Sequence, residues 1–142
     1  MTSTLRDILG DRPVHSVAPG ATLRQAARLM AEQGVGALAV LEDDRLLGIL
    51  SERDIVFRAV GQGLSVDSAT AGQVMTPDPV TVGIDDAISD TLAARLGDAF
   101  RHLPVMDAGR VVGLLSFRDI PAEYVMLYER FREMAAARPG QG

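Results

Sequence analysis

Apolar and polar residues follow the same order in two parts of the chain. Each part has two short apolar runs around a polar turn: 37–41 and 46–50 around 42–45, and 103–106 and 111–115 around 107–110. Apolar runs of about five residues on either side of a short turn are typical of β-hairpins. The chain is therefore expected to form two hairpins of similar design.

A helix is predicted before each hairpin. Apolar residues recur there at helical spacing: Leu23, Ala26, Ala27 and Met30 in the first part, and Ile88, Leu92 and Leu96 in the second. Thr22 is expected to cap the first helix, because a threonine oxygen accepts a hydrogen bond from an unpaired amide of the first turn. A short extended segment precedes each helix, at 14–17 and at 80–82.

One sequence motif follows each hairpin and repeats at a fixed offset. Gly48 to Ile55 reads GILSERDI and Gly113 to Ile120 reads GLLSFRDI, 65 positions later. At this offset ten residues of the segment 14–55 are identical to their counterparts. A further helix is expected to begin at each Ser-x-Arg-Asp. We therefore predict an α/β (α+β) fold in which a β-α-β-β-α unit is used twice.

The repeats suggest a division of the chain. It runs from repeat 1 at 5–62, through a connector with a short helix at 63–79, to repeat 2 at 80–124, a C-terminal amphipathic helix at 121–137 and a disordered end at 138–142. The short helix, Ala71 to Met75, is expected to mirror Leu5 to Leu9. Apolar residues share one face of the C-terminal helix: Tyr124, Leu127, Tyr128, Phe131 and Met134. That face either packs on its own domain or forms a dimer contact.

Composition excludes several kinds of site. The chain has 142 residues, no cysteine and two histidines, so disulfides, thiolate metal sites and histidine-rich metal centres are excluded. A net charge of −5 argues against a broad nucleic-acid surface. No apolar run approaches the roughly 20 residues needed to cross a bilayer, and no signal peptide is recognised. A cytoplasmic protein with no membrane contact is expected.

The strings MAEQGVGALAVLEDDRLLGILSERDI and RHLPVMDAGRVVGLLSFRDI resemble cystathionine-β-synthase (CBS) domains, and VMTPDPVTV resembles the start of a second CBS repeat. The resemblance covers about Leu5 to Tyr124. It implies a stand-alone tandem pair, also called a Bateman module, whose repeats are related by a pseudo-twofold axis with two clefts between them. It also implies an adenosyl ligand: AMP before others, with ADP, ATP, NAD or S-adenosylmethionine as alternatives.

The resemblance further implies roles for individual residues. Ribose hydroxyls are expected at Ser51, Asp54, Ser116 and Asp119, because an ionised carboxylate offers two acceptor oxygens to a diol. Phosphate is expected at Arg53, Arg118, Arg101 and His102, near helix N-termini that favour anions. Adenine is expected to be framed by Ser16, Val17, Ala37, Leu38, Thr81, Val82, Leu103 and Pro104. No catalytic residue, catalytic cofactor or metal is implied.

The motif also has a purely structural interpretation. A serine followed three residues later by an acid is close to a capping box, which starts a helix without any ligand. Arg53 and Arg118, each taken alone, are compatible with solvated charges on a helix surface. The in-register repetition favours a ligand role, and the serine can serve both purposes.

The two copies differ around the motif. Arg101 and His102 stand where the first copy has Gly36 and Ala37, which favours the second copy as the stronger phosphate site. Pro121 replaces Val56, so the second motif helix is expected to be interrupted and a new helix to start near Pro121.

Three functions are compatible with these features. The favoured one is a non-catalytic nucleotide sensor that forms a homodimer through its repeat faces and C-terminal helix and regulates a separate protein. A small nucleotide-processing enzyme is the first alternative, although the chain has no cysteine, no lysine and no complete phosphate-binding loop. The second alternative is a degenerate pair that serves only as a dimerising scaffold.

Overall fold

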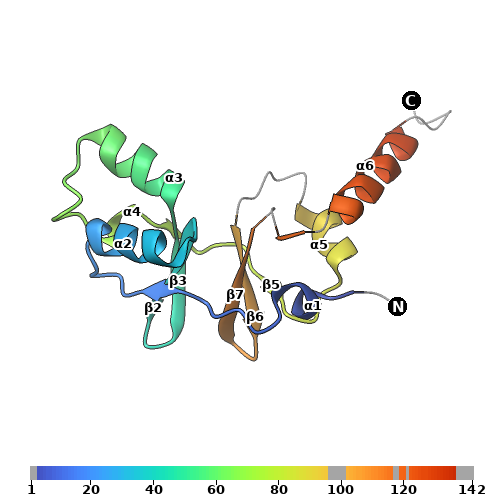
Figure 1. Cartoon of the computed structure of the whole chain (residues 1–142), viewed down its shortest axis with the longest axis horizontal. Coiled ribbons are helices and arrows are strands. Elements are labelled where there is room, and N and C mark those ends of the chain that lie inside the picture. The colour runs from blue at the N-terminus through green and yellow to red at the C-terminus, as the bar shows by residue number, and fades with distance from the viewer. Residues whose placement is uncertain (1–2, 96–101, 117–118, 121, 137–142) are drawn as a thin grey trace.

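Two small β-sheets and the helices beside them make two similar halves, seen side by side in Figure 1. The computed structural model describes residues 3–95, 102–116, 119–120 and 122–136. The first sheet has the order β1 (Ser16–Val17), β2 (Ala37–Glu42), β3 (Arg45–Ser51) and β4 (Thr76–Pro77), and the second has the order β5 (Val82–Gly83), β6 (His102–Asp107) and β7 (Arg110–Ser116). The helices are α1 (Leu5–Leu9), α2 (Leu23–Gln33), α3 (Glu52–Asp54), α4 (Ala71–Val74), α5 (Ile88–Arg95) and α6 (Ala122–Ala136).

The two hairpins are built to one plan, as the sequence predicts. Leu38 pairs with Leu50 in β2–β3, and Leu103 pairs with Leu115 in β6–β7, 65 positions further on. Both hairpins have a register shift at the equivalent position. In each half the preceding short strand pairs in parallel with the first strand of the hairpin. The repeat therefore extends from sequence to backbone pairing.

The hairpin turns have two residues each, with positive φ at both. The values are 50° and 64° for Asp43 and Asp44, and 51° and 81° for Ala108 and Gly109. Turns of this kind match the right-handed twist of the flanking strands. Aspartate and glycine tolerate positive φ, whereas alanine is less common there.

Helix α2 begins where the sequence places its cap. The Thr22 hydroxyl accepts a hydrogen bond from the Gln25 amide at 3.1 Å, and the Gln25 side chain accepts one from the Thr22 amide at 2.9 Å. The helix ends at Gly34, whose φ of 66° is left-handed. Leu23, Ala26 and Met30 are buried as predicted, but Ala27 is exposed.

Helix α3 starts at the first Ser-x-Arg-Asp motif, as expected, and continues as a π-helical turn, Ile55–Ala59, and a 3-10 turn, Val60–Gln62. The second motif is only partly described, because 117–118 and Pro121 lie outside the described residues. α6 runs from Ala122 to Ala136, where a helix over 121–137 was expected. The expected disordered end at 138–142 lies outside the described residues too.

The two short helices α1 and α4 exchange places between the halves. α1 precedes the first half in sequence but packs in the second: Leu5 and Leu9 are buried with Ile88 and Leu115. In Figure 1, α1 lies beside β5 and α5, and the chain then crosses to the other half. α4 completes the first half, where Ala71 and Val74 are buried with the α2 and hairpin side chains.

Matching backbone hydrogen bonds hold the exchanged helices. Leu5 N–H donates to Asp86 O at 3.0 Å, and Ala71 N–H donates to Ala21 O at 2.8 Å at the equivalent place. The predicted likeness of the two short helices is confirmed. The hydrophobic cores follow this exchange rather than chain order, and the sequence-based boundaries 5–62, 63–79 and 80–124 stay a prediction.

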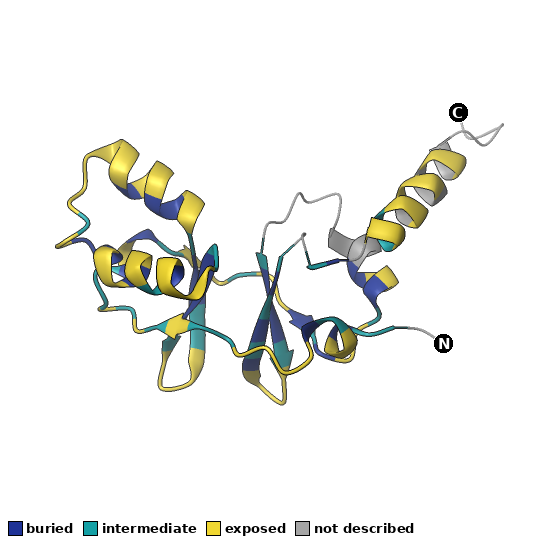
Figure 2. Ribbon diagram, viewed as in Figure 1, coloured by how far each residue is buried: buried dark blue, intermediate teal, exposed yellow. Residues whose placement is uncertain are grey.

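Buried residues follow the strands, and the outer faces of the helices are exposed (Figure 2). In the second half, Ile88 of α5 is buried as predicted; nothing is described for the Leu92 side chain or for Leu96. α6 contacts the second core through Tyr124 and Val125, and the Tyr124 hydroxyl lies 3.0 Å from Ser3 Oγ. No helix in the described ranges is both long and apolar enough to span a membrane.

Strand β4 was not predicted, because the connector 63–79 was expected to hold only the short helix. Thr76 pairs with Ile49 and Pro77 with Gly48, which places β4 at the edge of the first sheet. A Cβ at Gly48 would lie 2.5 Å from the Thr76 carbonyl oxygen. The equivalent Gly113 faces the Leu9 side chain instead, with 2.8 Å between the same Cβ position and Leu9 Cδ1.

This difference predicts unequal effects of two matched substitutions. Gly48→Ala should lower the free energy of unfolding by about 2–3 kcal/mol, because a backbone carbonyl must move, and Gly113→Ala by about 1 kcal/mol, because a side chain can adjust. Urea unfolding followed by far-ultraviolet circular dichroism measures both. Equal effects, or a larger loss for Gly113→Ala, would contradict this account of β4.

Candidate functional site

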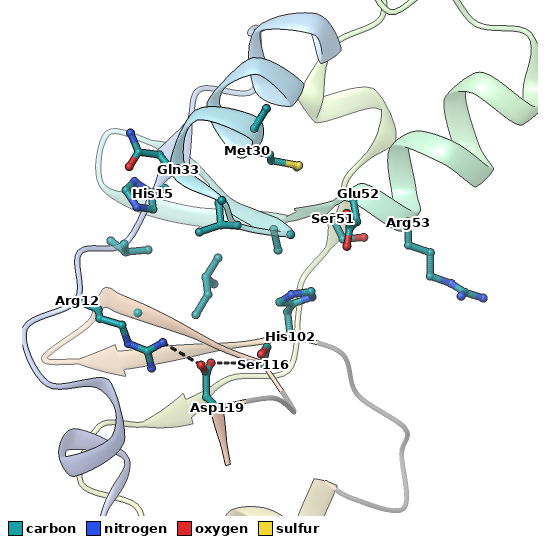
Figure 3. Close-up of a pocket in the computed structure, with 18 of the residues that line it drawn as sticks. Arg12, His15, Met30, Gln33, Ser51, Glu52, Arg53, His102, Ser116 and Asp119 are labelled. Carbon is teal, nitrogen blue, oxygen red and sulfur yellow. Dashed lines mark hydrogen bonds and ion pairs between the residues drawn. The ribbon is translucent and has the colours of Figure 1, made fainter. Parts of the chain in front are cut away.

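A cleft of about 1330 Å³ lies between the two halves (Figure 3). The segment that crosses from α1 to β1 lines one part of it with Leu9, Arg12, Pro13, Val14 and His15. The first half contributes Ala27, Met30, Ala31, Gln33, Gly34, Val35, Gly36, Ala37, Ser51, Glu52, Arg53, Ile55 and Val56. The second half contributes His102, Gly113, Leu114, Ser116 and Asp119. A molecule bound here would touch both halves.

The first Ser-x-Arg-Asp motif forms a complete capping box at the start of α3. The Ser51 hydroxyl accepts a hydrogen bond from the Asp54 amide at 3.1 Å, and Asp54 Oδ2 accepts one from the Ser51 amide at 3.0 Å. Asp54 Oδ1 also lies 3.4 Å from the Thr76 hydroxyl and 3.7 Å from Arg58 Nε. Ser51 lines the cleft, whereas Asp54 is buried and is not among the lining residues. The structural interpretation of this motif therefore holds, and the ribose role of Asp54 stays a prediction.

Two described residues of the second motif, Ser116 and Asp119, line the cleft. Asp119 Oδ2 accepts a hydrogen bond from the Ser116 amide at 2.8 Å, and Oδ1 accepts one from Arg12 Nη1 at 2.8 Å. Figure 3 shows these three residues together at one end of the cleft. The Asp119 side chain is 18% exposed and lines the cleft. Ser116 and Asp119 are thus brought together as the sequence predicts, and their ribose role stays a prediction.

The predicted phosphate-binding residues are only partly described. Arg101 and Arg118 lie outside the described residues. The Arg53 guanidinium lies 4.6 Å from the centroid of the Phe57 ring, a cation–π distance, and extends away from Ser51 in Figure 3. His102 lines the cleft close to Glu52: a Cβ at Gly36 would lie 3.1 Å from Glu52 Oε1 and 3.7 Å from His102 Nε2.

The residues expected to frame adenine divide into two groups. Ala37 lines the cleft. The others do not: Leu38, Val82 and Leu103 lie in the two hydrophobic cores, Pro104 is buried, Val17 is half-buried against the first core, and Ser16 and Thr81 are exposed. Their contact with adenine stays a prediction.

Three ionisable residues of the cleft were missed by sequence reasoning: Arg12, His15 and Glu52. Arg12 and His15 lie in the crossing segment, whose position depends on the exchange of α1 and α4. Glu52 lies inside the motif, but its counterpart at 117 is phenylalanine, so comparison of the two copies did not indicate a role for Glu52. Among the described residues, no group of three or more His, Cys, Asp or Glu could hold a metal ion.

Two surface ion pairs shift pKa values outside the cleft. Arg6 Nε lies 3.0 Å from Asp85 Oδ1, and this hydrogen bond lowers the pKa of Asp85 and raises that of Arg6. The hydrogen bond of Arg24 with Asp67 has the same effects. A lowered carboxylate pKa contributes stability above the unfolded-state value, which is lost as pH falls through the folded-state value. The first pair joins α1 to the turn before α5, so it helps to hold the exchanged helix.

Comparisons with known proteins agree with this architecture. A model of the CBS domain family matches residues 5–61 and 71–123. Hypoxic response protein 1 of Mycobacterium tuberculosis is 35% identical over 119 residues, which cover 83% of this chain and 82% of that protein. An uncharacterized 17.7 kDa protein of Acidianus ambivalens is 37% identical over 109 residues, and the match spans 75% of this chain and 65% of that relative.

A solved structure has the same fold. A CBS domain protein from Pyrobaculum aerophilum, complexed with AMP, superimposes with a TM-score of 0.78 and 28% identity, over 90% of this chain and 99% of that one. The mixed α/β architecture with two sheets therefore matches that of a CBS pair. On the family match to both repeats, the identity to its relatives and the shared fold, this chain belongs to the CBS domain family.

Proposed function

We propose that the chain is a non-catalytic regulatory module that binds an adenine nucleotide in the cleft between its repeats and signals to a separate protein. The observation that carries this proposal is the cleft itself, which is lined by both motif serines and by Asp119. The AMP complex of the Pyrobaculum aerophilum protein supports it, because that protein shares this fold at 28% identity.

The chemistry of the cleft suits a nucleoside phosphate. Asp119 offers carboxylate oxygens to a ribose diol, and Arg12 lies beside it as a cation for phosphate. Apolar side chains such as Met30, Val35 and Leu114 offer a surface to a base. The Glu52 carboxylate lies in the same cleft and would repel a long polyphosphate, which favours AMP over ATP.

Signalling would follow from the position of the ligand. A nucleotide that contacts both halves binds best to one relative arrangement of them. The nucleotide changes the populations of these arrangements only to the extent that it binds one arrangement more tightly than the others. ADP, ATP, NAD and S-adenosylmethionine are alternative ligands within this proposal.

A thermal-shift experiment with a product assay separates the three candidate functions. Purified protein is incubated with AMP, ATP and NAD in turn. We expect AMP to raise the melting temperature, because a ligand that binds only the folded state stabilises it by RT ln(1 + [L]/Kd). No product should form over many turnovers.

Other outcomes point to the alternatives. Product formed over many turnovers would support a small nucleotide-processing enzyme. No thermal shift with any nucleotide at roughly millimolar concentration would support a pair that serves only as a dimerising scaffold.

The two motif aspartates should differ in their effect on binding. Asp119→Ala should weaken AMP binding by about tenfold or more, because a charged hydrogen-bond acceptor is lost from the cleft. Asp54→Ala should affect AMP less and instead lower the free energy of unfolding by about 1 kcal/mol, because a helix cap is lost. Isothermal titration calorimetry and urea unfolding measure the two effects.

The surface variant Asp85→Ala serves as the control for removal of a carboxylate outside the cleft. It should leave AMP affinity unchanged. A larger loss of AMP affinity for Asp54→Ala than for Asp119→Ala would overturn the assignment of Asp119 to the ligand.

We also propose that two copies of the chain associate through the segment 56–64, which follows α3. Four apolar side chains there are 45–59% exposed: Val56, Phe57, Val60 and Leu64. This stretch is largely exposed in Figure 2. Apolar patches of this kind on a single chain are typical of protein contacts, and an isologous contact with a second copy is the simplest closed one. Leu127 and Met134 of α6, 61% and 70% exposed, are candidates for a second part of the contact.

Val60→Glu should weaken the dimer by at least about tenfold in Kd, because a charge is placed in an apolar contact. Sedimentation velocity over a concentration series measures the change. Met134→Glu tests the contribution of α6, and Glu32→Gln, at an exposed position of α2, is the control. A wild-type protein that stays monomeric at the highest concentration would refute the proposal.

A further inference from the structure

Arg12 lies between the halves, and its side chain contacts α1 and Asp119 of the second half. It lies in the segment that leaves α1, which packs in the second half, and enters β1 in the first. Its Nε and Nη2 each lie 3.4 Å from a carbonyl oxygen of α1, those of Leu9 and Ile8. These are carbonyls that the end of a helix leaves without intrahelical partners. The guanidinium therefore lies at the edge of the cleft, and its contacts with α1 are long enough to leave it able to move.

The same guanidinium covers part of Asp119. Its Nη1 lies 2.8 Å from Asp119 Oδ1, while Asp119 Oδ2 accepts the Ser116 amide at 2.8 Å. Each oxygen of the proposed ribose acceptor thus has a partner from the chain itself. A ribose diol that approaches Asp119 from the side of Arg12 must compete with a charged donor, and a charged donor makes a stronger hydrogen bond than a hydroxyl.

The other half lacks this arrangement. Asp54 has its cationic neighbour, Arg58, in the π-helical turn that follows α3, 3.7 Å away, and Asp54 does not line the cleft. α1 and α4 are related by an offset of 66, which pairs Arg12 with Asp78, a residue of opposite charge. The Arg12–Asp119 contact is therefore specific to one end of the cleft rather than a product of the repeat.

We propose that Arg12 is a specificity residue of this cleft, which occupies Asp119 in the free protein and moves to the phosphate of the nucleotide that displaces it. This inference rests on the proposed nucleotide-binding function. A neutral nucleoside can displace Arg12 only by leaving the guanidinium without an anion. A nucleotide supplies a phosphate that a guanidinium binds through two hydrogen bonds, so the lost ion pair is replaced. Arg12 thereby selects for phosphorylated ligands over nucleosides.

Binding of AMP and of adenosine to matched variants tests this proposal. Calorimetry is performed on the wild-type protein, Arg12→Gln, Arg12→Lys and Arg6→Gln. Arg6 is the control because it lies on α1 and pairs with Asp85 outside the cleft. For Arg12→Gln we expect AMP to bind at least about tenfold more weakly and adenosine to bind equally well or more tightly. The AMP affinity of Arg12→Lys should lie between those of the wild-type protein and Arg12→Gln, because lysine keeps the charge but lacks the paired donors of a guanidinium. Arg6→Gln should leave the ratio of the two affinities unchanged.

A second measurement follows Arg12 directly. In protein labelled with ¹⁵N, the Nε–H resonance that disappears in Arg12→Lys is assigned to Arg12. AMP should shift this resonance strongly, because its phosphate binds the guanidinium. Adenosine has no phosphate and should shift the resonance less. Arg12→Lys also supplies the affinity test if Arg12→Gln does not fold, which thermal unfolding reveals.

The possible failures are distinct. If the wild-type protein binds neither AMP nor adenosine, the proposed function is wrong and this inference falls with it. The specificity role of Arg12 is refuted if AMP binds the wild-type protein but Arg12→Gln lowers the affinities for AMP and adenosine by the same factor. It is also refuted if Arg12→Gln changes neither affinity. In both cases the nucleotide site stands.

Discussion

The exchange of the two short helices is the constraint on which the rest of the structure depends. Each half has a hairpin and a longer helix, but neither core is complete without a helix from another part of the chain. Leu5 and Leu9 fill the second core, and α4 fills the first. The chain must therefore cross between the halves, and the crossing segment becomes a wall of the cleft. The fold and the site share this one cause.

The hairpins and α2 were predictable because they are set by local patterns. Apolar runs, short polar turns and the threonine cap each involve only a few neighbouring residues, so the sequence shows them directly. The duplicated motif supports the prediction, because the same pattern occurs in both copies. β4 was not predictable in this way. Its two residues, Thr76 and Pro77, have no alternating pattern of their own, and they pair with residues 27 and 29 positions earlier in the chain.

The candidate site was predictable to a smaller extent. The motif serines and Asp119 do line the cleft, since the motif ends a strand that faces the other half. Arg12 could not be predicted as a site residue from the sequence, because its position beside Asp119 depends on a contact between residues 107 positions apart. The repeat comparison also treated Asp54 and Asp119 as equivalents. Their surroundings make them different: one is enclosed with Thr76 and Arg58, and the other meets Arg12 at the cleft.

The exchange also sets an order for folding during synthesis. Among the described residues, those packed in the first core extend no further than Met75, so this core can close while the second half is still being made. α1 is made earlier than any of this, yet its partner Leu115 comes 110 positions after Leu5. Contacts of such long range carry a loop-closure cost and form late. Helix α1 is thus made before both cores but is among the last elements to pack, and until then its two leucines are exposed to solvent and to other chains.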